Sequence, residues 1–526
     1  MSVVPNSMRR IVMERFLERH QDRITGVLSG FDRVLFRGTL RSISYRNGMD
    51  IFLSSQRVLY KNFGAFAERL SDRLKEHARR MASREGRPFR YLPSPSVSKE
   101  DIARQIIQED GIEEGLICVL SCVEPCKSFT IRRDREARQL VLVPAERRCL
   151  HLYFYYVDRQ FGLMHIRLQT WLPFTIQVCI NGREWLARQM DRVGIEYEQQ
   201  DNCFTWIGDV PKAQHIFDRL TQRRWARFLN ALARRVNPWI APENGLDLHG
   251  YYWSVRQGEY ATDVMFTDAP SLRDVYPRLV EHAIQRFGGK DILRFLGRRI
   301  MPSRFNGRST SELRSRYEGV CIKHRVEENS IKMYDKQGSV LRIETTINNP
   351  RRFKVRRMTT RKGQRAMRWI PMRKGVADIA RRVEVSRAAN ERYLEALAIV
   401  GIPSPTDRLL DPISTRKVRN GRPYRPLRPI SPEDARLFRV IMRGKFLLQG
   451  FRNKDLRRHL IPGAESDPTR RRRASARTTR CLRLLRAHGL IRKVSGTRYY
   501  RVTGKGHHVM TTALALRRMD VSGLAA

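Results

Sequence analysis

The C-terminal part of the chain constrains the fold most, because it specifies a fixed succession of short elements. The letters Ser-Pro-Glu-Asp at 431–434 are typical of a helix start, with Pro at the first helical position and acids in the first turn. Apolar spacing predicts this helix up to Gly444 and further helices at 453–460 and about 474–488. A β-hairpin over 490–502 and a last helix up to Met519 complete a small domain, 431–519.

The third of these helices has two chemically distinct faces. Projected at a helical period, one face is formed by Ala474, Thr478, Cys481, Leu482 and Leu485. The opposite face carries Arg473, Arg477, Arg480 and Arg483. Residues 470–519 contain fifteen Lys or Arg and no Asp or Glu, whereas a merely solvated surface usually mixes both signs. We therefore expect these arginines, with Arg498 and Arg501 of the hairpin, to contact nucleic acid.

This order of elements resembles the MarR-type winged helix. The resemblance rests on three helices, the letters HGLI at 488–491, the hairpin and the closing Tyr-x-Val-Thr-x-x-Gly at 500–506. It implies a winged helix-turn-helix fold for the C-terminal domain. It does not imply one function, since winged helices also serve transposases, replication initiators and protein contacts.

The charge of the whole chain points to the same kind of partner. The 526 residues hold 102 Lys or Arg against 53 Asp or Glu, a formal net charge of +49. Such an excess suits DNA or a structured RNA and predicts affinity that falls steeply with salt. No apolar run approaches the roughly 18 residues that span a bilayer. We expect a cytoplasmic, nucleoid-associated prokaryotic protein without a membrane partner, and the composition is compatible with a homodimer.

The alternation of apolar patterns predicts an α+β multidomain chain. Residues 1–210 predict an α/β body with one mixed sheet, in which a helix over 11–28 precedes a strand at 31–40. Residues 211–350 predict a helical, aromatic region with a hairpin near its end, and 351–430 a basic linker, one helix and a proline-rich linker. The winged helix at 431–519 follows.

Several acids in the predicted strands are candidates for catalysis. An RNase H-like nuclease or transposase body needs carboxylates that converge on divalent metals, the first in mid-strand and the second at the end of a later strand. Asp32 suits the first position, and Glu124, after the strand 116–123, suits the second. We therefore expect Asp32 and Glu124 to bind Mg²⁺ or Mn²⁺ if the protein is a nuclease. Further candidate acids are Glu259, Asp263, Asp158 and Glu344. Each of them is equally compatible with an ordinary ion pair.

Two further basic segments are candidates for contact with phosphates. Residues 351–375 carry eleven Lys or Arg and no acid, which indicates a linker or a strap along a nucleic-acid backbone. The candidate residues there are Arg351, Arg352, Lys354, Arg356 and Arg357. The hairpin 330–347 turns at 337–339 and resembles the "Y-D-K … L-R-x-E" hairpin of phage and plasmid replication initiators, without their histidine pair. Its Lys332 and Lys336 either contact phosphate or form cross-strand ion pairs.

The chain as a whole resembles a group of uncharacterised bacterial proteins of similar length whose occurrence is mobile-element-like. The shared segments are 161–186, Tyr-Tyr-Trp-Ser at 251–254, Leu-Arg-Ile-Glu-Thr-Thr-Ile-Asn at 341–348 and the winged helix. The resemblance implies mobile-element DNA processing by a recombinase, nuclease or replication factor. The alternative is a non-enzymatic winged-helix regulator or architectural binder. The length of 526 residues and the basic charge spread along the body both favour the first hypothesis.

Overall fold

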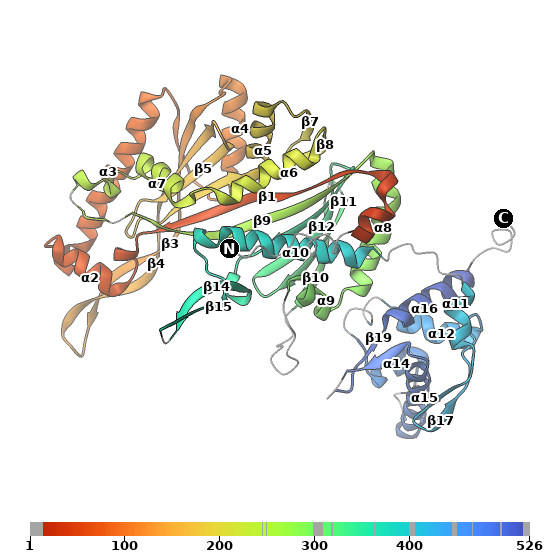
Figure 1. Ribbon diagram of the computed structural model, residues 1–526. Helices are drawn as coiled ribbons and strands as arrows, with labels where there is room; N and C mark the ends of the chain where they lie inside the picture. Colours follow the sequence, from red (N-terminus) through yellow and green to blue (C-terminus); the bar gives the residue numbers. More distant parts are fainter. Residues whose placement is uncertain are drawn as a thin grey trace. The chain divides into compact units, whose positions relative to one another are not determined.

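The computed structural model (Figure 1) divides the chain into two compact units. It describes residues 14–244, 246–248, 250–297, 309–316, 319–361, 363–398, 406–443, 446, 450–464, 467–494 and 497–518. The first unit comprises Met1–Val280 and Gly288–Ala398, and the second comprises Glu281–Phe287 and Ile399–Ala526. No helix within these described ranges is long and apolar enough to cross a membrane.

One large sheet organises the first unit. In the described part of the chain it has eleven strands in the order β10-β11-β12-β13-β9-β1-β6-β5-β4-β3-β2, antiparallel except for β2 beside β3. Its strands are β1 (Ile24–Thr39), β2 (Phe89–Leu92), β3 (Gly115–Asp134), β4 (Gln139–Asp158), β5 (Gly162–Gln169), β6 (Ile176–Asn181), β9 (Tyr252–Phe266), β10 (Ser309–Arg316), β11 (Gly319–Val326), β12 (Asn329–Lys336) and β13 (Val340–Thr346). Figure 1 shows the long strands β1 and β9 side by side through the middle of the unit.

Helices and two hairpins pack around this sheet. The helices are α1 (Glu14–Arg19), α2 (Arg46–Ser55), α3 (Phe63–Arg84), α4 (Lys99–Asp110), α5 (Gly182–Val193), α6 (Val210–Arg219), α7 (Trp225–Val236), α8 (Ala269–Arg286), α9 (Gly289–Phe295) and α10 (Ile379–Leu397). The main apolar core lies between the sheet and helices that include α3, α5, α6 and α7. A smaller core joins α4 to β3 and β4. The hairpins are β7 (Tyr197–Gln200) with β8 (Cys203–Ile207), and β14 (Lys354–Arg361) with β15 (Gln364–Pro371).

The sheet corrects the predicted domain boundaries. Strands from 1–210 and from 211–350 hydrogen-bond to each other through β1 and β9, so residue 210 does not end a domain. Helix α10 also belongs to this unit, although we predicted it between two linkers. The boundary was wrong because local patterns reveal strands but not which distant strands pair.

Three local predictions also need correction. The helix predicted over 11–28 ends at Arg19, and β1 begins at Ile24, because pairing with β9 outweighs the local helical pattern; 11–13 lie outside the described residues. The helical region predicted to begin at 211 starts with α6 at Val210 and continues, after a break, in α7. The basic segment 351–375 is an antiparallel hairpin rather than a linker, since β14 pairs with β15 along its whole length.

The hairpin predicted at 330–347 is confirmed as β12 and β13. Gln337 and Gly338 both have positive φ, as a tight two-strand turn requires. The hairpin lies within the large sheet, and β13 is entirely buried between β12 and β9. Its polar side chains therefore belong to the interior of the sheet.

The second unit contains the elements predicted for 431–519, in their predicted order. These are α12 (Pro432–Ile441), α14 (Asn453–Leu460), α15 (Pro468–Ala487), β18 (Ile491–Lys493), β19 (Tyr500–Val502) and α16 (Gly504–Leu516). Gly444 and the turn residues 495–496 lie outside the described residues. Helix α15 begins earlier than predicted, because Asp467 caps it and Pro468 follows at its first position. The proline-rich segment before α12 also packs into this unit, with α11 (Thr406–Leu410), β16 (Lys417–Arg419) and β17 (Arg422–Tyr424).

Candidate functional site

Three carboxylates from three adjacent strands meet at the centre of the sheet. Asp32 on β1, Glu259 on β9 and Glu344 on β13 have carboxylate oxygens within 4.8 Å of one another. A bulge between Phe31 and Val34 interrupts the pairing of β1 with β9 beside Glu259. Because a bulge redirects side chains, it accounts for how Asp32 joins the acids of the neighbouring strands. We call Asp32, Glu259 and Glu344 the acidic cluster.

A buried arginine links the acidic cluster to Asp263. The Arg342 guanidinium donates to Asp263 at 2.6 and 2.9 Å and to Asp32 at 3.2 Å. Arg183 contributes a second ion pair to Asp263, at 3.1 Å. Although burial acts to raise the pKa of Asp263, Arg183 and Arg342 hold it below its ordinary value. Asp263, predicted as catalytic, is therefore a partner of two arginines and lies outside the acidic cluster.

Glu344 is likewise held by neighbouring side chains. Lys332 donates to it at 2.7 Å from the facing position on β12, and the Tyr334 hydroxyl donates at 2.9 Å. Burial opposes ionisation, yet Lys332 and the two hydrogen bonds keep the pKa of Glu344 below its ordinary value. The cross-strand ion pair that we considered for Lys332 is thus confirmed.

Glu259 differs from the other two acids of the cluster, because no Lys or Arg side chain among the described residues forms an ion pair with it. Among the described residues it forms no salt bridge, and Gln257 donates to it at 2.7 Å. Burial, followed by the negative charge of Glu344, raises the pKa of Glu259. Burial also raises the pKa of Asp32, against the opposing effect of Arg342. Burial thus disfavours the charged forms of both carboxyl groups.

Glu124 does not lie with Asp32. Strand β3 is separated from β1 by β4, β5 and β6, a distance of about 19 Å at the usual strand spacing. Glu124 instead accepts from Arg167 at 2.6 Å and from the Tyr153 hydroxyl at 2.6 Å, and it lies 3.4 Å from Lys99. It is also in the middle of a strand and not at its end, because β3 continues to Asp134. The expected pairing of Asp32 with Glu124 on a shared metal is therefore replaced by the acidic cluster.

A group of arginines occupies the same strands as the acidic cluster. Arg37 on β1 faces Gln177 on β6, which faces Arg167 on β5. With its amide turned so that the oxygen faces the arginines, Gln177 accepts from Arg167 at 3.0 Å and from Arg256 of β9 at 2.7 Å. Burial, then the charges of Arg256 and Arg167, lower the pKa of Arg37. We call Arg37, Arg167 and Arg256 the arginine cluster.

The acidic cluster and the arginine cluster share one face of the sheet. Gln177 and Cys179 are two residues apart on β6 and therefore point to the same side. The charges that act on the Cys179 thiol include those of Glu259 and Asp32, while burial raises its pKa to about 11. Along β6, Cys179 lies between Gln177, which faces Arg37, and Asn181, which faces Arg33 beside Asp32.

The basic residues predicted in the first unit fall into two groups. Arg351, Lys354 and Arg356 are exposed, and no salt bridge to a described residue holds them. The others are engaged by acids: Lys336 with Asp201 at 3.0 Å, Lys332 with Glu344, Arg352 with Glu327 at 3.1 Å, and Arg357 with Asp378. Lys336 and Arg357 are therefore held by acids within the unit, and of the two roles left open for Lys332 the cross-strand ion pair is the one that forms.

The faces predicted for the third C-terminal helix are present on α15. Ala474, Thr478, Leu482 and Leu485 are buried, and Cys481 is half-buried. The six predicted arginines, Arg473, Arg477, Arg480, Arg483, Arg498 and Arg501, are all exposed. Asn453 at the start of α14 donates to Ser475 at 3.0 Å and to Thr479 at 2.8 Å, which fixes the two helices together. The second unit thus exposes a basic face of α15, while the opposite face of this helix packs against the rest of the unit.

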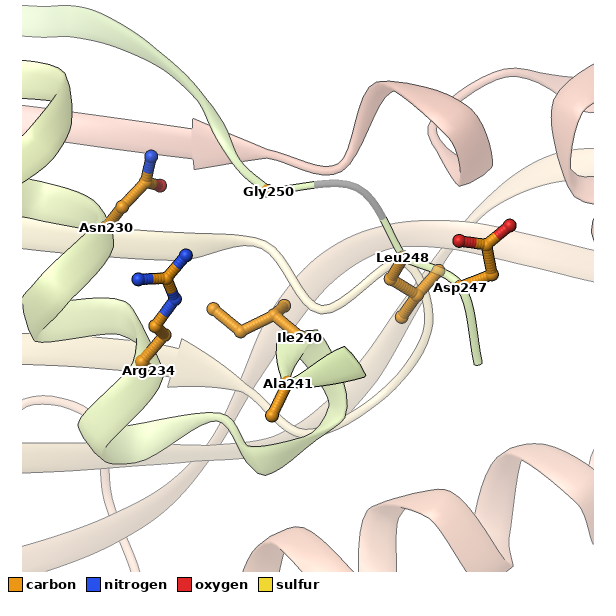
Figure 2. Close-up of a pocket in the computed structure, with 7 residues that line it drawn as sticks. All are labelled: Asn230, Arg234, Ile240, Ala241, Asp247, Leu248 and Gly250. Carbon is orange, nitrogen blue, oxygen red and sulfur yellow. The ribbon is translucent and has the colours of Figure 1, made fainter. Parts of the chain in front are cut away.

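A separate pocket lies beside α7 (Figure 2). It has a volume of about 200 Å³. Its lining residues are Asn230, Arg234, Ile240, Ala241, Asp247, Leu248 and Gly250. None of the predicted site residues lines it, and Asn230 accepts a hydrogen bond from the Trp253 indole at 2.8 Å. We assign no role to this pocket.

Comparisons with family models, curated proteins and solved structures gave no match to the chain. The function is therefore argued from its own residues. Sequence reasoning named each member of the acidic cluster but missed Arg342, Arg183 and Asn202, whose side-chain nitrogen donates to Asp32 at 2.7 Å. The letters Leu-Arg-Ile-Glu at 341–344 held a signal, since Arg342 and Glu344 must share one face of a strand.

Proposed function

We propose that the protein binds nucleic acid and processes the DNA of a mobile element by metal-dependent phosphodiester chemistry. The observation that carries the proposal is the pairing of an arginine cluster with an acidic cluster on one face of the sheet. Arginines hold phosphate through charge and directed hydrogen bonds. Carboxylates that converge on a divalent cation are the usual partners of such chemistry.

The donor set of the acidic cluster suits Mg²⁺ or Mn²⁺. Both ions prefer oxygen ligands, and three carboxylates offer oxygens within 4.8 Å of one another. Asp32, Glu259, Glu344 and Asp263 carry four negative charges, against three positive charges on the partners described above, Arg342, Arg183 and Lys332. The remaining negative charge is that of Glu259. Bound metal would polarise a phosphate oxygen and lower the pKa of a water molecule, while Asp32, Glu259 and Glu344 would hold it.

In this proposal the second unit is a winged helix that recognises nucleic acid. Support comes from the order of its elements and from the exposed arginines of α15. Helix α15 would lie in a major groove as the recognition helix, with Arg498 and Arg501 of the β18–β19 hairpin near the DNA backbone. A structured RNA partner is equally suited to the charge of the chain. The proposal keeps one feature of the RNase H-like hypothesis, which is a set of carboxylates gathered around a central strand.

The decisive experiment compares Glu259→Gln with the wild type in Mn²⁺ binding and in cleavage of DNA substrates. We expect the substitution to abolish cleavage and to weaken Mn²⁺ binding at least tenfold, with affinity for DNA in the absence of metal unchanged. Glu136→Gln, an exposed residue in the turn between β3 and β4, is the matched control and should behave as the wild type. Tight Mn²⁺ binding by Glu259→Gln would refute the metal site.

A non-enzymatic regulator or architectural binder is the second candidate. One observation favours it: Asp32 and Glu344 already accept hydrogen bonds from Arg342, Asn202, Lys332 and Tyr334. A network satisfied in this way can hold the strands together without metal. In that case neither Mg²⁺ nor Mn²⁺ binds the wild type, and DNA affinity depends on the second unit alone.

A further inference from the structure

The hairpin β14–β15 has one face that is exposed along its whole length. Cross-strand neighbours on this face are Arg356 with Trp369 and Met358 with Met367, flanked by Lys354 and Arg365. All six side chains are exposed, with 65% of Trp369, 47% of Met358 and 49% of Met367 open to solvent. The opposite face is partly covered, and its Val355 is buried. The hairpin thus turns its large apolar side chains outward.

The base of the hairpin is firmly attached to the first unit. Phe353 and Met372 are buried, and the Met372 amide donates to the Phe353 carbonyl at 2.8 Å. Asp378 binds Arg357 and accepts from the Arg373 amide at 2.8 Å. Figure 1 shows β14 and β15 as a narrow arm beside the large sheet. A rooted arm can hold its exposed face in one place, as a binding element requires.

Both the charge and the aromatic side chain indicate the occupant. Residues 351–375 have eleven basic and no acidic side chains, which suits a polyanion and disfavours a protein surface of mixed charge. An exposed indole flanked by cations suits an unpaired base, because base stacking on aromatic rings accompanies phosphate contacts in single-strand binding. Bases within a duplex are already stacked on each other and offer no such face.

The hairpin also lies near the proposed reaction site. Ser254 of β9 forms a bridge with Gly375, directly after the hairpin, and the Lys374 carbonyl accepts from the Val255 amide at 2.9 Å. Arg256 of the arginine cluster follows at once, and Glu259 lies five residues beyond Ser254, roughly 15 Å along the strand. A strand held by the hairpin would be a few nucleotides from the acidic cluster.

We propose that β14–β15 is a single-strand-binding arm, on which an unpaired base stacks against Trp369 while Lys354, Arg356 and Arg365 contact flanking phosphates. The inference rests on the proposed nucleic-acid function and deepens it, since it makes single-stranded nucleic acid the substrate class beside the acidic cluster. The arm would keep a strand unpaired on the first unit.

The test measures binding of the full chain to a single-stranded oligonucleotide and to a duplex of the same length, by fluorescence anisotropy. We expect Trp369→Ala to weaken single-strand binding about 5- to 150-fold, with duplex binding and salt dependence unchanged. Trp369→Phe should retain most of the affinity, because a phenyl ring still stacks. Trp206→Ala removes another partly exposed tryptophan, on β8, and should have no effect.

Each other outcome overturns the inference in a distinguishable way. Equal loss for single strand and duplex would overturn the inference, because Trp369 would then not distinguish an unpaired strand from a duplex. Unchanged single-strand binding in Trp369→Ala would refute the arm and leave its exposed face to a protein partner. Failure of the wild type to bind any nucleic acid would instead refute the proposed function itself.

Discussion

At the scale of single residues, the centre of the sheet depends on buried charges that neutralise one another. Arg342 is fully buried and is bonded to Asp32 and Asp263. A buried pair adds little net stability, but removal of one partner leaves a buried charge without compensation. The stability of the first unit therefore depends on substitutions at these buried side chains.

Replacement of Arg342 by Met should destabilise the first unit by about 3–5 kcal/mol. Arg183 remains beside Asp263, but Asp32 loses its buried cation. The measurement is denaturant unfolding followed by circular dichroism. Arg314→Met removes an exposed arginine paired with Glu312 and should shift stability by less than about 0.5 kcal/mol. Similar stability of the two variants would contradict the role given to Arg342.

Glu259 should make the metal-free protein less stable at neutral pH than at mildly acidic pH. A carboxyl whose pKa is raised by folding contributes stability when protonated, and that contribution is lost as pH rises through its folded pKa. The thermal midpoint should therefore increase as pH is lowered from 8 toward the ordinary glutamate value of about 4.3. Glu259→Gln should raise the midpoint at pH 8 and flatten this dependence. An unchanged pH profile in the variant would count against repulsion between Glu259 and Glu344.

At the scale of elements, α15 combines a buried face that holds the second unit together with an exposed face free for binding. Leu482 and Leu485 lie in the core, while Arg477 and Arg480 are exposed. The two faces can therefore be separated by substitution. This distinguishes a folding defect from a binding defect in the same helix.

Leu482→Ala should lower the stability of the second unit by about 2–5 kcal/mol. Arg477→Ala with Arg480→Ala should leave stability unchanged and reduce the slope of log affinity against log salt by about two. Calorimetry and anisotropy titrations measure the two effects. Arg132→Ala with Arg135→Ala removes two exposed charges near the turn between β3 and β4 and should leave the slope unchanged. An equal change of slope in this control would show that only total charge matters.

At the scale of the whole molecule, charge governs the encounter with nucleic acid. A net charge of +49 attracts a phosphate backbone regardless of sequence. If the chain covers 6–10 phosphates, affinity should fall about 10³- to 10⁵-fold between 50 and 200 mM salt. Anisotropy titrations of a duplex across that range provide the measurement. A nearly flat dependence would mean that the basic residues do not face the bound nucleic acid.

The sequence by itself determined the features that depend on neighbours along the chain. The helices of the second unit follow from caps and apolar spacing, and the arginine face of α15 follows from its period. The turn of β12–β13 follows from Gln337 and Gly338. The presence of a large sheet was predicted, although its strand order was not, because β-branched and aromatic runs favour strands.

Only the tertiary structure decided which distant strands pair. The acidic cluster joins residues 32, 259 and 344, and no local pattern reveals that β1, β9 and β13 are neighbours or that a bulge redirects Asp32. The same pairing separated Glu124 from Asp32, and it decided between the two roles left open for Lys332 by placing Glu344 opposite it. Strand order is set by burial of the whole sheet, which is a property of the complete chain and not of any segment.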